Sequence, residues 1–179
     1  MNDVVDMILA QWANTRPDLD VSPMAPVGRI HRAYRLLSKE ISTHMHTHGL
    51  EAWEFDMLAT LRRSGPPHTL TPKDLVATSM VGSSALTNRV DRLVKRNLVT
   101  RQTDPENRRR LLITITDEGL ALVDRVVSSH VENERRLLNG LHEDERKSLD
   151  GLLRKLLLSL GDSAPSTQSS GRPGSTGTS

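Results

Sequence analysis

The sequence contains no cysteine, which excludes disulfide bonds and thiolate metal sites. Aromatic residues are also scarce, with two Trp, one Tyr and one Phe among 179 residues. Because single-stranded nucleic acid is bound largely by stacking of bases on aromatic rings, this scarcity argues against that class of protein. No apolar run approaches the roughly 18 residues of a membrane span, and residues 1–12 include two acidic residues and no basic one. We therefore expect a cytoplasmic protein with no membrane partner.

Motifs of catalysis are absent as well. The chain has no nucleophile elbow, phosphate-binding loop or HExxH zinc motif, so an enzyme is not expected. His44 and His48 share one face of a helix, whereas His46 points away from it, and no cysteine or adjacent acid completes a metal site. We expect these histidines to face solvent and no metal to be bound.

Positive charge is concentrated in one stretch. The formal net charge is only +2, but from Arg89 to Arg110 eight Lys or Arg against three Asp or Glu leave an excess of five. Apolar residues at positions 86, 90, 93 and 94 follow helical spacing, and residues 98–103 and 111–116 are rich in β-branched residues, as in the strands of a hairpin. Because a basic helix fits the major groove and an arginine-tipped hairpin reaches the minor groove, the expected partner is double-stranded DNA.

A second helix precedes the basic one. Thr71 to Asp74 form a capping pattern, with a hydroxyl at the cap, proline at the first position and an acid at the third. A short helix to Thr78, a turn and the basic helix from residue 82 make a helix-turn-helix, and the hairpin makes it winged. Small donors and arginines on its outer surface suit phosphates and base edges. The expected DNA-contacting residues are Ser83, Ser84, Thr87, Asn88, Arg89, Arg92, Arg108, Arg109 and Arg110.

Amphipathic helices flank this unit on both sides. A monomer has too little interior to cover all their apolar faces, and large exposed apolar patches usually mark interfaces. We therefore expect a homodimer with two-fold symmetry that places two recognition helices about one duplex turn apart. A compact all-helical monomer is the alternative. The predicted helices outside the helix-turn-helix span residues 3–14, 27–47, 51–63, 117–140 and 143–160, with a proline-containing loop at 16–26.

The predicted fold class is mainly α with a small β-wing, a winged helix-turn-helix with N- and C-terminal dimerisation helices. Residues 1–50 are assigned to the N-terminal dimerisation helices and residues 51–116 to the DNA-binding lobe. Residues 117–161 are assigned to the C-terminal dimerisation helices. Residues 162–179 consist almost entirely of Ser, Thr, Gly and Pro with other polar residues, so we expect a disordered tail.

The order of helices and the hairpin sequence resemble the MarR family of bacterial transcription regulators. The matching motifs are DPENRR at residues 104–109 and LLITITDEG at residues 111–119. The resemblance spans residues 4–160 and implies a dimeric, ligand-responsive regulator that binds DNA. Asn107 stands where many members carry Asp, and an amide can still form a hydrogen bond there.

A narrower resemblance concerns residues 11–24, QWANTRPDLDVSPM, which are similar to the extra first helix and loop of the urate-responsive branch of the family. This resemblance implies a ligand site made by Trp12, Asp56, Arg89 and Arg101. A simpler role stays open for each residue. These roles are the dimer core for Trp12, pairing with an arginine for Asp56, the protein surface for Arg89, and solvent or phosphate contact for Arg101.

Together these features lead to the hypothesis of a repressor that binds palindromic DNA and releases it when a small organic anion binds. The implied effector is urate, a related purine or an aconitate-like carboxylate, and no other cofactor is expected. Two arginines and a tryptophan suit a flat or carboxylated anion. The alternatives are a metal-responsive regulator of the same fold and a helical protein–protein adaptor that does not bind DNA.

Overall fold

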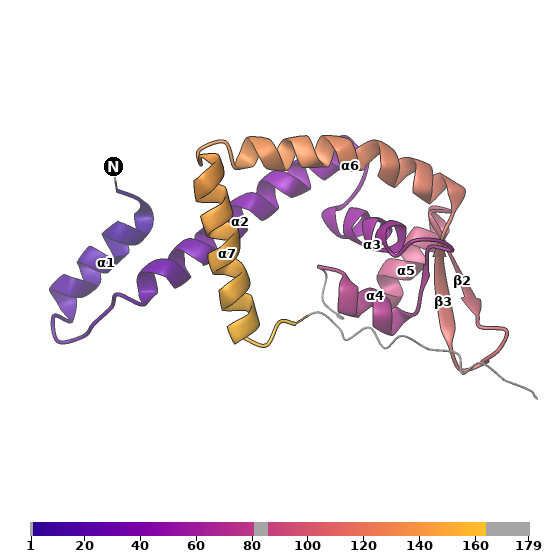
Figure 1. Cartoon of the computed structure of the whole chain (residues 1–179), viewed down its shortest axis with the longest axis horizontal. Helices are drawn as coiled ribbons and strands as arrows, with labels where there is room; N and C mark the ends of the chain where they lie inside the picture. The colour runs from indigo at the N-terminus through magenta and orange to yellow at the C-terminus, as the bar shows by residue number, and fades with distance from the viewer. Residues whose placement is uncertain (1, 81–85, 164–179) are drawn as a thin grey trace, which may run out of the picture.

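A computed structural model describes residues 2–80 and 86–163 of the chain. It confirms the predicted fold class, because the chain is mainly helical with a small three-stranded antiparallel sheet (Figure 1). The elements in chain order are α1 (Val4–Thr15), α2 (Met24–Thr47), α3 (Ala52–Arg63), β1 (Thr69–Leu70), α4 (Pro72–Thr78), α5 (Leu86–Lys95), β2 (Val99–Thr103), β3 (Leu111–Ile115), α6 (Asp117–Leu137) and α7 (Glu143–Ser159).

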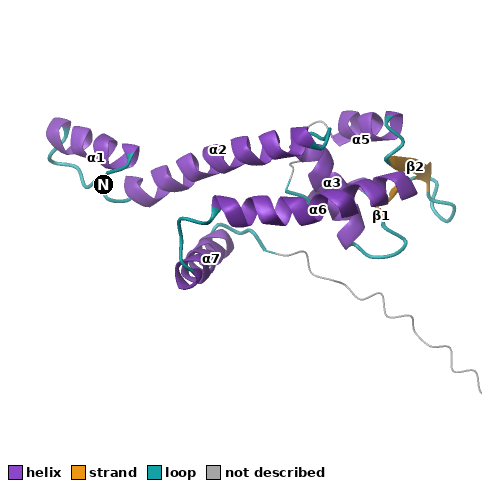
Figure 2. Ribbon diagram, turned by 90° about the horizontal axis from the view of Figure 1, so that it is seen from above, coloured by secondary structure: helices purple, strands orange, loops and turns teal. Residues whose placement is uncertain are grey.

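Helices α2 and α6 lie side by side and form a stem between the two ends of the molecule (Figures 1 and 2). At one end, α3, α4 and α5 gather with the sheet into the winged helix-turn-helix (Figure 1). At the other end, α1 packs against α2, and α7 turns away from the end of α6. The stem therefore separates the winged helix-turn-helix from the helices at the chain ends.

Helix α2 begins at Met24, three residues before its predicted start at residue 27. The prediction placed Pro26 in the loop, but Pro26 occupies the third position of the helix. Proline is tolerated there because the N–H groups of a first turn have no intrahelical partner in any case. The other predicted helices and strands agree with the structure to within three residues. The predicted start of α5, at residue 82, lies outside the described residues.

The sheet has the order β1–β3–β2, so β3 is its central strand. The predicted hairpin is confirmed, because β2 pairs with β3 in antiparallel orientation and Arg101 lies opposite Ile113. Strand β1 is absent from the prediction, because two residues are too few to show a periodic pattern. Its Thr69 pairs with Thr114, and its Leu70 pairs with Ile113. This pairing brings the start of α4 beside the wing.

The hydrophobic core is built around α3, which packs against α2, α4, α6 and β3. Met57, Leu58 and Leu61 of α3 are fully buried. They join Val90 and Leu93 of α5 in one apolar cluster. Burial of each such side chain stabilises the folded state by about 1.5–3 kcal/mol. The apolar stripe of α5 therefore faces inward, and its polar residues remain outside.

Helix α1 is attached to α2 by an apolar contact and two ion pairs. Val5 is buried against Gly28, where a Cβ would lie 3.4 Å from Val5 Cγ1. Arg29 donates from Nε to Asp3 at 2.8 Å and from Nη2 to Asp6 at 2.5 Å. The extra first helix is therefore docked on the stem of its own chain.

Much apolar surface remains uncovered in the single chain. No residue of α7 is buried, and its Leu152 is 68% exposed. Tyr34 on α2 is 71% exposed. Apolar patches of this kind are typical of protein–protein interfaces.

Among the described residues, no helix has both the length and the apolar character that would be needed to cross a membrane.

Among the described glycines, Gly119 in the first turn of α6 leaves the least room for a side chain. A Cβ there would lie 2.3 Å from the carbonyl oxygen of Leu98 and 2.8 Å from Ile115 Cγ1. We predict that Gly119→Ala lowers the free energy of unfolding by about 2–3 kcal/mol, because the helix must move off the backbone. Gly140→Ala, whose Cβ meets nothing within 4 Å, is the control and should change stability by less than about 1 kcal/mol. Urea denaturation measures both, and equal stabilities would contradict the contact.

Candidate nucleic-acid interface and ligand cavity

The outer face of α5 carries the predicted DNA-contacting side chains. Thr87, Asn88 and Arg92 are exposed, and Arg89 is half-buried. Their positions agree with a helix that presents donors outward, while contact with a duplex stays a prediction. Two further predicted contacts lie outside the described residues: Ser83 and Ser84.

The arginines at the tip of the wing, Arg108, Arg109 and Arg110, are all exposed. Asn107 holds the tip, because its side-chain oxygen accepts a hydrogen bond from the backbone N–H of Arg109 at 3.1 Å. Asp104 lies 3.7 Å from Arg110. Among the described residues, Arg108 and Arg109 have no carboxylate within ion-pair distance. The amide at position 107 therefore braces the backbone of the wing and leaves these charges uncompensated.

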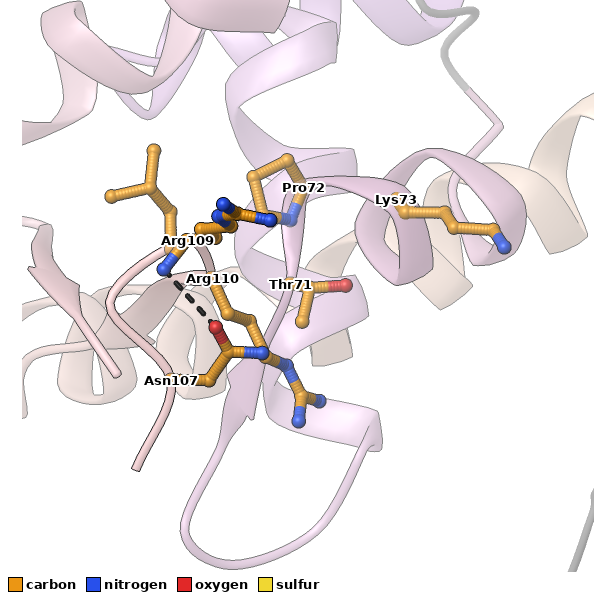
Figure 3. A pocket seen from close by; sticks show the side chains of 7 residues that line it. Thr71, Pro72, Lys73, Asn107, Arg109 and Arg110 are labelled. Carbon is orange, nitrogen blue, oxygen red and sulfur yellow. Dashed lines mark hydrogen bonds between the residues drawn. The ribbon is translucent and has the colours of Figure 1, made fainter. Parts of the chain in front are cut away.

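A cleft of about 420 Å³ lies between the wing and the start of α4 (Figure 3). Arg109 and Arg110 line it from the wing, and Thr71, Pro72 and Lys73 line it from α4. Three cationic side chains around one cleft suit a phosphate group. Lys73 is not among the predicted DNA contacts, because a lysine within a helix cap carries no sequence signal of its own. Only the pairing of β1 with β3 places it beside the wing.

The C-terminal end of α5 is anchored to a buried carboxylate. Glu54 is 1% exposed, and its Oε2 accepts a hydrogen bond from Arg96 Nη1 at 2.6 Å. Arg96 Nη2 donates to the carbonyl oxygen of Gly49 at 3.0 Å. Because a buried carboxylate without a cationic partner costs several kcal/mol, this pair fixes α5 against the corner between α2 and α3.

The four residues of the predicted ligand site lie on four different elements of the chain. Arg101 forms an ion pair with Asp91 at 2.7 Å, and Arg89 Cζ lies 5.5 Å from the centre of the Trp53 ring. Within one protomer, Asp56 lines a large cavity between α3 and α6, whereas the other three residues do not. The four-residue site therefore stays a prediction. The residues are Asp56 on α3, which lines the cavity, Trp12 on α1, Arg89 on α5 and Arg101 on β2.

The cavity at Asp56 has a volume of about 380 Å³. Phe55, Val123 and Val127 contribute to its apolar wall. Asp56 Oδ2 accepts a hydrogen bond from the backbone N–H of Met80 at 2.9 Å. The cavity wall is thus bonded to Met80, which follows α4 in the chain.

Charged groups of both signs line the same cavity. Arg62 donates to Asp124 at 2.8 Å, and this hydrogen bond raises the pKa of Arg62 above its ordinary value. Arg63 donates to the carbonyl oxygen of Thr78. A small ligand with both donors and acceptors fits such a lining. The charged residues are Asp56, Arg62, Arg63, Asp124 and Glu134.

The prediction that the histidines of α2 face solvent is wrong for His44 and His48. His46 is exposed as expected, but the other two are half-buried. The rings of His44 and His48 lie 4.9 Å apart, and the ring of His130 on α6 lies 6.4 Å from that of His44. Helical spacing places both histidines on one face of α2 but does not show that α6 covers that face.

The hydroxyl of Ser129 on α6 lies within hydrogen-bond distance of both histidines. It donates its single proton to the carbonyl oxygen of Val126 at 2.9 Å. Ser129 Oγ also lies 3.3 Å from His44 Nε2 and 3.0 Å from His48 Nε2, so one hydroxyl joins both imidazoles to α6. In the described part of the chain, no group of three or more His, Asp or Glu is placed to hold a metal ion.

Comparison with known proteins connects this geometry to a family. A sequence profile of the MarR family matches residues 48–110, which contain the helix-turn-helix and most of the wing. The chain is 42% identical over 152 residues to the HTH-type transcriptional regulator PecS of Dickeya dadantii, covering 85% of this chain and 92% of that protein. The chain belongs to the MarR family.

Solved structures of MarR-family regulators share the fold. A MarR mutant from Escherichia coli in complex with operator DNA matches with a TM-score of 0.68 and 27% identity, over 78% of this chain and 99% of that chain. The structure of Bordetella bronchiseptica BpsR, whose DNA binding is regulated by 6-hydroxynicotinic acid, matches with a TM-score of 0.66 and 28% identity, over 72% and 90%. The predicted family is confirmed, and this MarR-family chain is a DNA-binding transcription regulator rather than an enzyme.

His44 gives this MarR-family protein a pH-dependent stability. Burial, followed by the charges of His48, His130 and Arg136, lowers the pKa of His44. In the unfolded chain His44 binds the proton more tightly, with a pKa of about 6.5. The contribution of neutral His44 to the free energy of unfolding is therefore complete above that pH and is lost as the pH falls below it.

We predict that His44→Gln reduces the pH dependence of the free energy of unfolding between about pH 7.5 and 5.5. Chemical denaturation at both pH values measures it. His31→Gln, at an exposed position of the same helix, is the control, and an unchanged pH dependence in the His44 variant would contradict the assignment.

Proposed function

We propose that this regulator is a cytoplasmic, homodimeric repressor whose hold on DNA is released by a small organic anion. The observation that carries the proposal is the basic surface formed by α5, the wing tip and Lys73. It combines outward-facing donors on a helix with cations on both sides of a cleft. This shape suits a duplex, because the helix enters the major groove while cations contact phosphates.

A homodimer accounts for the uncovered apolar surface at both chain ends. A two-fold dimer buries the same patches on each chain, here on α1, the first half of α2, and α7. In this arrangement residues 1–50 and 117–161 form the dimerisation part, and residues 51–116 form the DNA-binding lobe. Two recognition helices then meet a palindromic site whose half-sites lie about 34 Å apart. Exposed apolar residues that support this interface are Ile8, Val27, Tyr34, Leu153 and Leu157.

The cavity beside Asp56 is the proposed ligand site. Its volume of about 380 Å³ lies within the range of small-molecule pockets. The proposed ligand class is a flat organic anion, such as urate, a related purine, an aconitate-like carboxylate or a hydroxynicotinate. Arg63 supplies a cationic donor in the cavity wall. Trp12, Arg89 and Arg101 join this site only from the partner chain or after a change of shape.

Asp56 supplies the proposed link between ligand and DNA. It accepts a hydrogen bond from the N–H of Met80, which precedes α5 in the chain. An anion beside Asp56 repels its carboxylate and favours a shape in which this bond is lost. The ligand acts only through its preference for the shape that does not bind DNA, and a tenfold loss of DNA affinity requires about 1.4 kcal/mol of that preference.

Replacement of Arg109 tests the DNA surface. We expect Arg109→Gln to weaken binding to duplexes of any sequence by roughly three- to tenfold and to lower the slope of log affinity against log salt by about one, because a phosphate contact is lost. Fluorescence anisotropy with a random-sequence duplex at several salt concentrations measures both. Arg16→Gln, which removes an arginine paired with Asp18 at the α1 end of the molecule, is the control. Wild-type affinity and slope in the Arg109 variant would remove the wing from the interface.

The ligand site is tested by a thermal-shift screen with urate, 6-hydroxynicotinic acid and cis-aconitate. A ligand that binds the folded state raises the melting temperature, and it should also lower the affinity for duplex DNA. In Asp56→Asn the amide oxygen still accepts from Met80 but does not repel an anion, so release of DNA by the same compound should fall at least about threefold. Asp18→Asn is the control outside the cavity. Undiminished release in the Asp56 variant would separate this residue from the response.

A further inference from the structure

The indole of Trp53, in the first turn of α3, contacts two arginines of the recognition helix. Arg92 Cζ lies 4.8 Å and Arg89 Cζ lies 5.5 Å from the centre of its ring. Both distances are within the roughly 6 Å at which an aromatic face attracts a guanidinium. Trp53 is half-buried and packs against the hydrophobic core at the same time. The ring is therefore a fixed platform for both side chains.

This contact differs in kind from the one that holds the next arginine of the same helix face. Arg96 donates from Nη1 to the carboxylate of Glu54, which compensates its charge, and from Nη2 to the carbonyl oxygen of Gly49. Among residues 2–80 and 86–163, no atom accepts a hydrogen bond from the guanidinium of Arg89 or Arg92, and neither is in an ion pair. Arg96 is thus committed to the fold, whereas Arg89 and Arg92 keep their donors and their charge.

An aromatic platform suits arginines that bind phosphate. A mobile arginine loses rotamer freedom when it binds, and this loss weakens the complex. Contact with Trp53 removes part of that freedom beforehand and leaves the N–H donors available for a phosphate or a guanine edge. A carboxylate at position 53 would also hold the side chains, but it would occupy their donors and cancel their charge.

We propose that Trp53 is a positioning residue for DNA binding, which holds Arg89 and Arg92 in the orientation that contacts the duplex. The proposal rests on the DNA surface proposed above, to which both arginines belong. Trp53 itself lies on α3, outside the recognition helix, and acts on the duplex through the two guanidinium groups.

A double-mutant cycle between Trp53 and Arg92 tests the proposal. Trp53→Leu keeps an apolar side chain for the core but removes the aromatic face, whereas Trp53→Phe retains a smaller face. Affinity is measured by anisotropy for a labelled random-sequence duplex pool of about 24 base pairs, long enough for two half-sites. We expect Trp53→Leu to weaken binding roughly three- to tenfold and Trp53→Phe to weaken it less. The loss caused by Arg92→Gln should be at least about threefold smaller in the Trp53→Leu background than in the wild type.

The control cycle combines Trp53→Leu with Arg109→Gln. The wing arginine does not contact the indole, so its loss should be the same in both backgrounds. Equal losses from Arg92→Gln in both backgrounds, or wild-type affinity in Trp53→Leu, overturn the proposal. If Trp53→Leu shows no cooperative unfolding transition on heating, the same cycle is run with Trp53→Phe. Equal losses of affinity from Arg92→Gln in the wild type and in Trp53→Phe then also overturn the proposal. A wild-type protein without salt-dependent affinity for the duplex would overturn the proposed DNA surface instead.

Discussion

The carboxylate of Glu54 is the charge around which the DNA-binding end of this protein is arranged. It is buried, and a buried charge requires a paired cation. Arg96 supplies that cation from the end of α5 and also binds the carbonyl oxygen of Gly49, just beyond α2. The same carboxylate accepts from the N–H of Glu51 at the start of α3. The Glu54–Arg96 pair therefore joins the end of the recognition helix, the central helix and the corner that follows α2.

Helix α3 carries the other contacts of the proposed mechanism at neighbouring positions. Trp53 contacts two arginines of α5, and Asp56 both binds Met80 and lines the cavity. The DNA surface and the cavity are thus connected through one largely buried helix rather than through a loop. Because packed helices move as rigid units, a displacement of α3 against α6 also displaces α5. This is the physical basis on which ligand binding and DNA binding can influence each other.

The seam between α2 and α6 is polar where it meets this central helix. The hydroxyl of Ser129 lies within hydrogen-bond distance of His44 and His48. The ring of Phe55 on α3 lies 4.7 Å from that of His130. His130 also lines the cavity, and among the described residues its buried Nδ1 has no hydrogen-bond partner. His130 therefore belongs both to the packing of the stem and to the wall of the cavity.

The helices, the hairpin and the location of the basic surface could be predicted from the sequence alone, because apolar periodicity and local charge are properties of neighbouring residues. Pro26 shows the limit of such signals, since its place in a first turn depends on where the helix begins. The folded chain was needed to show that α6 covers His44, that β1 brings Lys73 beside the wing, and that Arg89 contacts Trp53. These contacts join residues far apart in the chain. A local pattern shows which side chains are polar, but only packing decides which of them are paired and which charges remain for a partner.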